Sequence, residues 1–221
     1  CYFNNLIYIN YPQCAGFMQI IYNIFMEKLI KIVNDSFVNS IETKRAFLEM
    51  YKDKIVEVGL IMAQALMDGN KIMFFGNGGS AADAQHLAAE IVGRYKKERK
   101  GLPSIALTTD TSILTAVGND YGFDVIFERQ IEALCMPGDI AIGISTSGNS
   151  PNVIKGLMKA HDLGATTIAF SGKQGGKVVD IAHYSFIVPS YDTARIQECH
   201  ITLGHTLCEI IDEVVNEKLM A

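Results

Sequence analysis

Apolar residues recur at helical spacing over residues 26–69, the first regular pattern along the chain. They fall three or four positions apart, as in a helix that buries one face: Leu29, Ile32, Val33, Phe37, Ile55, Val58, Ile61 and Met62. The pattern predicts two helices that join near Tyr51. It ends at Asp68 and Gly69, after which the spacing of the apolar residues changes.

Five short apolar runs follow, each of four or five residues: 72–75, 104–107, 140–144, 166–170 and 185–188. A helical pattern comes after each of them, and the last helix is predicted from about Ala194 to Leu219. Strands that alternate with helices form a parallel sheet that is covered on both faces. The predicted fold class is therefore α/β, in one domain over residues 26–221, because no linker separates a second domain.

The first 25 residues differ from the rest of the chain. They contain no charged residue and no Met at position 1, and they lack the basic start of a signal peptide. Asn, Pro and Gly residues interrupt the segment, so no run of about 20 apolar residues could span a bilayer. We expect Met26 to be the biological start and residues 1–25 to be extraneous or poorly ordered. The alternative is a hydrophobic arm for oligomerisation or for a membrane surface.

Composition and charge narrow the function classes. Hydrophobic residues make up 49% of the chain and charged residues 19%, which is typical of a globular protein. The net charge of −5 argues against a nucleic acid or an anionic membrane as the partner, because both require a basic face. The five cysteines are scattered and form no CxxC pair, which predicts a reducing, cytoplasmic setting.

Two loops that follow predicted strands are suited to a sugar phosphate. The first is Gly76-Asn77-Gly78-Gly79-Ser80, whose glycines let backbone amides approach an anion closely. The second is Ser145-Thr146-Ser147-Gly148-Asn149-Ser150, where Ser150 is a predicted N-cap before Pro151. Hydroxyls at a helix N-terminus can bind phosphate without Lys or Arg. An ordinary tight turn is the alternative for each loop, and it is weaker for the second.

The first loop also fits the pattern G-x-G-x-x-A through Gly76, Gly78 and Ala81. That pattern opens dinucleotide sites when an acidic residue follows about 20 positions later. Here Asp110 follows some thirty residues after the loop, at the end of the next predicted strand. The poor spacing makes a dinucleotide site the minor alternative.

Two predicted helices carry titratable side chains at helical spacing. His86, Glu90 and Arg94 lie four residues apart on one, and Gln197 and His205 lie eight apart on the other. His86, Glu90, Gln197 and His205 could meet as an acid–base set or as ligands of one divalent metal. The alternative is that the histidines are satisfied in the core or at an interface, and that Glu90 and Arg94 are a surface pair.

Four motifs in this order and spacing resemble the phosphoheptose isomerases (sedoheptulose-7-phosphate isomerases) of the sugar isomerase (SIS) domain superfamily. They are GNGGSAADAQHLAAEIVGRY, VGNDYGF, GISTSGNSPNV and RIQECHITLGH, and the resemblance covers Met26 to Ala221. It implies a SIS-type three-layer sandwich with a five-stranded parallel sheet and N-terminal helices. It also implies a homotetramer with active sites at subunit interfaces, and heptose synthesis for lipopolysaccharide or other surface glycans.

The resemblance also implies roles for individual residues. Glu90 would be the general base and His205 the general acid of an aldose–ketose isomerase. The implied phosphate loop consists of Ser145, Thr146, Ser147 and Ser150. Further implied substrate contacts are Asn77, Gly78, Gly79, Glu90, Asn119, Asp120 and Gln197, with Arg94 close to the site. One zinc ion per subunit would be held by His86, Glu90, Gln197 and His205. Where some members have an acidic residue before Arg-Ile-Gln, this chain has Ala194.

A non-catalytic relative is the alternative function. One branch of the same superfamily binds the bacterial replication initiator, and others sense sugar phosphates. The initiator-binding branch lacks the acid–base residues at the positions of Glu90 and His205, and this chain keeps both. The expected partners are a sugar-phosphate substrate and further copies of the chain.

Overall fold

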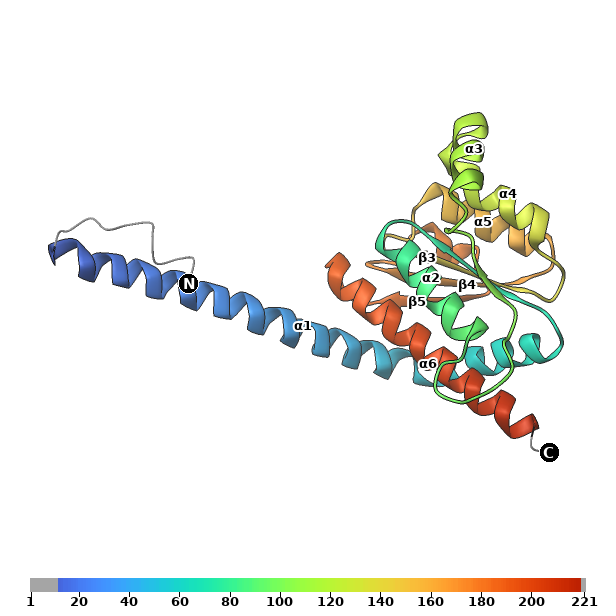
Figure 1. The fold of residues 1–221 in the computed structure, drawn as a ribbon, viewed down its shortest axis with the longest axis horizontal. Helices are drawn as coiled ribbons and strands as arrows, with labels where there is room; N and C mark the ends of the chain where they lie inside the picture. The colour runs from blue at the N-terminus through green and yellow to red at the C-terminus, as the bar shows by residue number, and fades with distance from the viewer. Residues whose placement is uncertain (1–11, 220–221) are drawn as a thin grey trace. The chain divides into compact units, whose positions relative to one another are not determined.

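A five-stranded parallel sheet is the centre of the fold in the computed structural model, which describes residues 12–219 (Figure 1). The strand order is β2-β1-β3-β4-β5. All five apolar runs predicted as strands are confirmed, with these bounds: β1 Ile72–Gly76, β2 Ser104–Ala106, β3 Ile140–Ser145, β4 Thr166–Gly172 and β5 Tyr184–Val188. From β1 the chain adds β2 on one side and then β3, β4 and β5 on the other, so the order of strand addition reverses between β1 and β3. Open parallel sheets bind ligands at such a point.

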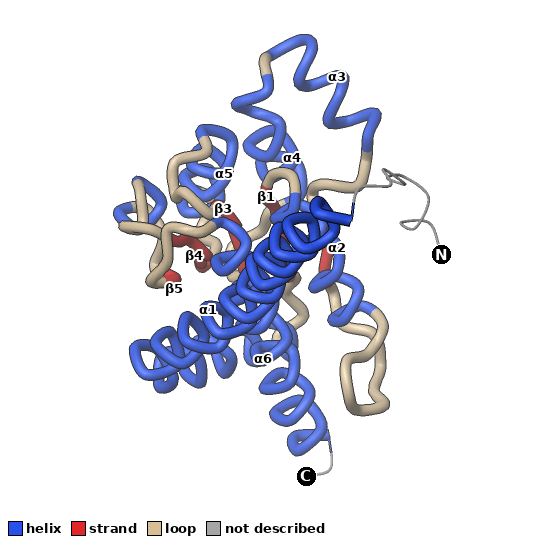
Figure 2. The backbone as a smooth tube through the Cα atoms, turned by 90° about the vertical axis from the view of Figure 1, so that its left-hand side faces the viewer, coloured by secondary structure: helices blue, strands red, loops and turns tan. Residues whose placement is uncertain are grey.

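Helices cover both faces of the sheet (Figure 2). Their bounds are α1 Pro12–Met67, α2 Gly79–Val92, α3 Thr111–Tyr121, α4 Ile126–Leu134, α5 Pro151–Asp162 and α6 Thr193–Leu219, with 3-10 turns η1 Phe123–Val125 and η2 Lys177–Asp180. The end of α1 packs on one face together with α2 and α6. Helices α4 and α5 pack on the other face. The predicted three-layer arrangement is therefore confirmed.

Alternate side chains of one strand enter the two halves of the core. Phe74 joins the apolar cluster beneath α1, α2 and α6. Phe75 joins the cluster on the opposite face, where its ring centroid lies 5.4 Å from that of Phe127. Both phenylalanines are buried. This is why the strands read as continuous apolar runs and not as alternating ones.

The prediction of two helices joined near Tyr51 is wrong, because α1 continues through that residue. The segment around Tyr51 contains no Gly or Pro that would end a helix. Tyr51 instead anchors the helix on the sheet. Its ring lies 5.5 Å from the ring of Phe186 in β5, and its hydroxyl accepts a hydrogen bond from the Ile187 amide at 3.3 Å.

The described residues form two units, which divide after Ile41. In the first unit, large apolar side chains are exposed along α1, among them Ile20, Ile24, Phe25, Ile32 and Phe37. Residues 12–25 belong to this helix, whereas residues 1–11 of the segment expected to be extraneous lie outside the described residues. Within the described part of the chain, no helix is both long and apolar enough to cross a membrane.

Candidate active site

Two asparagines join the loop after β1 to the loop after β3. We call residues 76–80 the glycine loop and residues 145–150 the hydroxyl loop. Asn77 Nδ2 donates to Asn152 Oδ1 at 2.9 Å, and Asn152 Nδ2 donates to Asn77 Oδ1 at 2.9 Å. Asn152 is buried in the first turn of α5. Asn152 is not among the predicted site residues, although it follows Ser150 and Pro151 directly at the start of the helix after the second loop. This amide pair sets the position of the glycine loop relative to the hydroxyl loop.

The glycine loop lies against a side chain of α6. A Cβ atom on Gly79 would fall 2.3 Å from Gln197 Nε2, so only glycine leaves room for that amide. Gly78 has a φ of +56°, a conformation that side chains rarely adopt. The structure therefore brings the glycine loop with Gly78 and Gly79 against Gln197, three residues expected in one site.

The hydroxyl loop holds its own serines together. Ser145 Oγ lies 3.0 Å from Ser150 Oγ and 3.5 Å from Ser147 Oγ. Ser150 occupies the predicted N-cap of α5 with Pro151 next, but its hydroxyl makes no capping hydrogen bond. Thr146 is half-buried between Ser145 and Ser147. Three hydroxyls and the N-terminus of α5 thus form a polar cluster suited to an anion.

The loop after β4, which contains Gly175 and Gly176, packs directly against the backbone of the hydroxyl loop. Gly148 has a φ of +65°, and a Cβ atom there would fall 1.7 Å from the Gly175 carbonyl oxygen. The Val178 amide donates to the Gly148 carbonyl at 3.1 Å. A larger residue at position 148 would therefore displace the hydroxyl loop.

Three titratable side chains, those of His86, Glu90 and His205, meet between α2 and α6, and we call them the histidine cluster or the acid–base cluster. His86 Nε2 lies 3.1 Å from Glu90 Oε1 and 2.9 Å from His205 Nε2. One ligand atom from each residue lies within 4.8 Å of the other two. The structure thus brings together three of the four residues expected to meet, across 119 residues of sequence between the two histidines.

A glycine explains why these helices approach so closely. A Cβ atom on Gly204 would fall 2.4 Å from Leu87 Cδ1, so α6 packs directly on α2 at this point. Gly204 and Leu87 are the immediate neighbours of His205 and His86 in sequence. The crossing of the two helices therefore places the imidazoles in contact.

The surroundings of His205 favour its neutral form. Burial and the neighbouring His86 lower the pKa of His205, and Lys96 adds to this effect, whereas Glu90 opposes it. The His205 ring also stacks on Tyr95, with centroids 5.4 Å apart and an angle of 17° between the planes. Burial raises the pKa of Asp83, one turn before His86 on α2. A neutral His205 can donate a proton from one ring nitrogen or bind a metal through it.

This cluster offers the donors that a divalent metal requires. Two imidazole nitrogens and a carboxylate oxygen are the usual ligands of zinc, and an amide oxygen such as that of Gln197 is a weaker fourth. Metal ligation requires neutral imidazoles, which the lowered pKa of His205 provides. The residues present therefore fit a zinc ion as well as a metal-free acid–base set.

Other predicted site residues lie apart from this cluster. Helix α2 ends at Val92, so the predicted stripe of His86 and Glu90 does not continue to Arg94, whose Nε pairs with Glu98 at 3.3 Å. Asn119 and Asp120 are exposed on α3, where Asn119 Nδ2 donates to Asp120 Oδ1 at 2.8 Å. For the described residues, no hydrogen bond joins Arg94, Asn119 or Asp120 to the cluster.

Two acidic residues near the site, Asp110 and Asp192, accept hydrogen bonds at the starts of helices. Asp110 Oδ1 accepts from the Ile113 amide at 2.9 Å and begins α3, so the carboxylate required by the dinucleotide alternative has a local structural role. Asp192 Oδ1 accepts from the Ala194 amide at 2.9 Å, at the start of α6. Neither carboxylate belongs to the histidine cluster.

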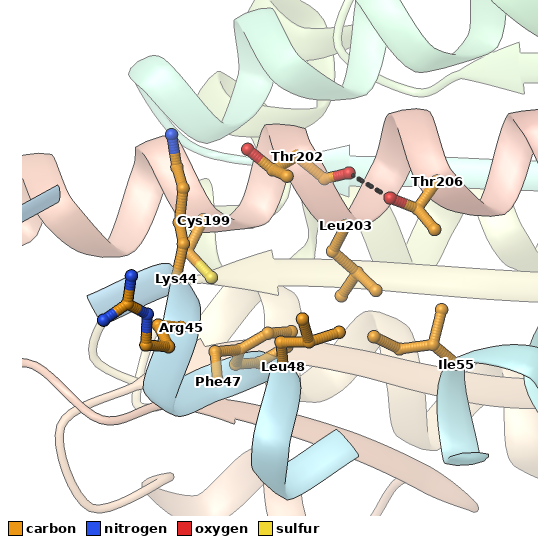
Figure 3. A pocket seen from close by; sticks show the side chains of 9 residues that line it. All are labelled: Lys44, Arg45, Phe47, Leu48, Ile55, Cys199, Thr202, Leu203 and Thr206. Atoms are coloured by element: carbon orange, nitrogen blue, oxygen red, sulfur yellow. Dashed lines mark hydrogen bonds between the residues drawn. The ribbon is translucent and has the colours of Figure 1, made fainter. Parts of the chain in front are cut away.

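An apolar groove of about 310 Å³ lies between α1 and α6 (Figure 3). Its walls are Phe47, Leu48 and Ile55 of α1 and Cys199 and Leu203 of α6, and Lys44 and Arg45 lie at one end. Thr202 and Thr206 complete the lining. Thr202 lies three residues before His205 on α6 and Thr206 lies directly after it, so the groove and the cluster of His86, Glu90 and His205 share one helix.

Comparison with known proteins finds relatives that match most of the chain. The family model of the SIS domain matches residues 36–172. The phosphoheptose isomerase of Aquifex aeolicus is 71% identical over 193 residues, which cover 87% of this chain and 99% of that protein. Phosphoheptose isomerase 1 of Campylobacter jejuni is 58% identical over 165 residues, 75% of this chain and 89% of its own length. The structure of the phosphoheptose isomerase from Neisseria gonorrhoeae superposes with a TM-score of 0.79 at 46% identity, covering 84% of this chain and 99% of that one.

Proposed function

The chain belongs to the phosphoheptose isomerase family of SIS-domain proteins, and on that premise we propose how its residues interconvert sedoheptulose 7-phosphate and D-glycero-D-manno-heptose 7-phosphate. The observation that carries the proposal is the meeting of His86, Glu90 and His205 between α2 and α6. Helix α2 starts directly at the glycine loop, which the asparagine pair joins to the hydroxyl loop. Acid–base groups and an anion site thus lie on connected elements.

Glu90 and His205 divide the proton transfers. An aldose–ketose isomerisation moves a proton between the first two carbons of the sugar through an enediol. The Glu90 carboxylate takes the proton from one carbon and returns it to the other. His205, neutral because burial lowers its pKa, donates an N–H to the substrate oxygen, as a neutral imidazole does in other isomerase sites. Each positioned transfer contributes about 10²–10⁴-fold in rate.

The hydroxyl loop binds the phosphate. Ser145, Thr146, Ser147 and Ser150 supply hydroxyl donors, and the N-terminus of α5 supplies free amides and a positive dipole end. The glycine loop and Gln197 contact the sugar chain between the phosphate and the acid–base cluster. Asn119, Asp120 and Arg94 remain proposed contacts, reached from α3 and from the segment after α2.

A zinc ion held by His86, Glu90, Gln197 and His205 is part of the proposal. If held there, the ion would polarise carbonyl and hydroxyl oxygens of the sugar. The support is the donor set itself: three ligand atoms within 4.8 Å of one another. The prediction is about one zinc per subunit by elemental analysis, and a sharp loss of affinity in His86→Ala.

We further propose a homotetramer in which one subunit's helices complete the site of another. The support is the apolar groove between α1 and α6 and the exposed apolar side chains of residues 20–41. Both are typical of surfaces that become buried on assembly. The free thiols of Cys135, Cys199 and Cys208 fit a reducing cytoplasm as the compartment. Sedimentation equilibrium tests the assembly, and a fully active monomer would contradict it.

Turnover of the named substrate tests the proposed function. We expect purified protein, with and without added zinc, to convert sedoheptulose 7-phosphate to the aldose, the first step towards the activated heptose of surface glycans. Absence of turnover under both conditions would favour the non-catalytic alternative, a protein that binds the replication initiator or senses sugar phosphates. The alternative is disfavoured here because Glu90 and His205 are both present and in one cluster.

A further inference from the structure

A buried ion pair joins the segment after α2 to α6. Arg99 Nε donates to Asp212 Oδ1 at 2.6 Å, and each side chain is only 1% exposed. The Lys96 and Lys97 amides donate to Asp212 Oδ2 at 2.8 Å and 3.0 Å. Burial alone would raise the pKa of Asp212, but these hydrogen bonds hold it below its usual value. Asp212 is therefore a charged acceptor for three donors from one short segment.

The same guanidinium also binds the last turn of α2. Arg99 Nη2 donates to the Glu90 carbonyl at 3.1 Å, and Nη1 donates to the Ile91 carbonyl at 2.9 Å. These carbonyls lie at the C-terminal end of the helix, where no further helical turn supplies N–H donors to them and where a cation is favoured. One planar side chain thus fixes the backbone of Glu90 relative to α6.

We propose that Arg99 is a positioning residue for the acid–base cluster, because it ties the backbone of Glu90 to the helix that carries His205. The proposal rests on the proposed isomerase function. Asp212 follows His205 by seven residues, about two helical turns, so it lies on the same side of α6. The crossing at Gly204 holds α2 and α6 together beside the histidines, and Arg99 holds them at the other end of the same contact.

Stability alone gives a weak reason for this arrangement. Removing two charges from water costs about as much as their attraction returns, so a buried ion pair adds little net stability compared with apolar packing. Two exposed pairs already link the same segment to α6, namely Lys96 with Glu209 and Lys97 with Glu213. What the exposed pairs lack is a contact with the α2 backbone. Arg99 supplies that contact, and its rigid, forked geometry suits it to three acceptors at once.

The variant Arg99→Lys tests the proposal, with Lys97→Met as the matched control. A lysine keeps the charge but cannot reach Asp212, Glu90 and Ile91 together. We expect Arg99→Lys to lower kcat at least about tenfold, because small displacements of reacting groups cost this much or more. We expect KM to change little, since the Arg99 side chain is buried in contacts with the protein itself. Lys97→Met removes an exposed link between the same segment and α6, and we expect it to keep the wild-type kcat.

The assays are run at a temperature where circular dichroism shows all three proteins fully folded. Under that condition, a purely structural role predicts an unchanged kcat in Arg99→Lys, which would overturn the proposal. An equal fall of kcat in Lys97→Met would overturn it too, because any loosening of the segment would then suffice.

A crystal structure of Arg99→Lys gives a readout that does not depend on turnover. We expect the contact between His86 Nε2 and His205 Nε2, 2.9 Å in the wild type, to lengthen by about 0.5 Å or more, the tolerance of a catalytic arrangement. An unchanged contact, together with an unchanged position of Glu90, would refute the positioning role. A wild type that fails to turn over the substrate would refute the proposed function instead, and the crystal structure would still decide the role of Arg99.

Discussion

The hydroxyl loop and the histidine cluster solve different physical problems within one site. The hydroxyl loop is local: Ser145, Ser147 and Ser150 lie within six residues and hydrogen-bond to one another. The histidine cluster is assembled from two helices whose contributing histidines are 119 residues apart. The loop consists of neutral groups, whereas every member of the cluster has an ionisable side chain.

This contrast shows what each part requires. A phosphate carries its charge already, so a short loop with hydroxyls and helix amides suffices to hold it. Proton transfer requires groups whose charge changes, and their pKa values depend on neighbours from other segments. The histidine cluster therefore depends on helix packing, at Gly204 and at Arg99, in a way that the hydroxyl loop does not.

The largest expected effect comes from the cluster itself. Glu90→Gln and His205→Ala remove a proton acceptor and a proton donor, so we expect each to lower kcat by at least about 10² with the fold intact. Steady-state kinetics measures the effect, and circular dichroism controls for folding. Near-wild-type activity in either variant would remove that residue from the mechanism.

The next effect concerns the hydroxyl loop. Each lost hydrogen bond to a charged group costs about 1.5–3 kcal/mol, so sedoheptulose without its phosphate should react far more slowly at limiting concentration. Ser147→Ala should lower kcat/KM for the phosphorylated sugar about tenfold or more while it affects the unphosphorylated sugar little. Comparable kcat/KM for the two sugars with the wild type would refute phosphate binding by this loop.

The helix crossing gives an intermediate effect. Gly204→Ala places a methyl group against Leu87, so we expect a loss of about 1–3 kcal/mol in the free energy of unfolding and a kcat lowered about tenfold. The double variant Gly204→Ala with Leu87→Ala makes room for the methyl group. Denaturant unfolding and kinetics should show partial recovery of kcat in the double variant. If kcat stays at the wild-type value in Gly204→Ala, the close crossing does not position His205.

The smallest effect is a shift in pH dependence. The positive charge of Lys96 contributes to the lowered pKa of His205, behind burial and His86, so Lys96→Met should raise that pKa. Activity requires neutral His205 and falls as the pH drops through its pKa. The acidic limb of kcat/KM should therefore move to higher pH in Lys96→Met and stay in place in Ser147→Ala. A shift to lower pH, or the same shift in both variants, would contradict this assignment.

The sequence predicted those features that depend on nearby residues. The five strands, α6 and the two loops follow from local apolar runs, glycines and caps, and the structure confirms their positions. The prediction of a joint near Tyr51 is wrong because no Gly or Pro ends the helix there, and Tyr51 packs on Phe186. The end of α2 at Val92 was missed because Gly93 was the only local breaker.

The sequence did not predict the hydrogen bonds that hold the elements of the site together, because they join residues far apart in the chain. The pairing of Arg99 with Asp212 and of Asn77 with Asn152 joins residues that are 113 and 75 positions apart. Helical spacing placed His86 with Glu90, and it placed Gln197 with His205. It contained no information on which other helix each pair meets. The family resemblance implied that the two pairs meet in one site. The close packing of α2 and α6 at Gly204 explains how His86 and His205 come into contact.

Solvent deuterium incorporation tests most directly whether the cluster between α2 and α6 moves the proton. Sedoheptulose 7-phosphate is incubated in D₂O with the wild type and with Glu90→Gln, and NMR follows the hydrogens on the first two carbons. We predict deuterium in the ketose and at the second carbon of the aldose with the wild type, and none above background with Glu90→Gln. Incorporation by Glu90→Gln at the wild-type rate would show that another group takes the proton and would contradict the account.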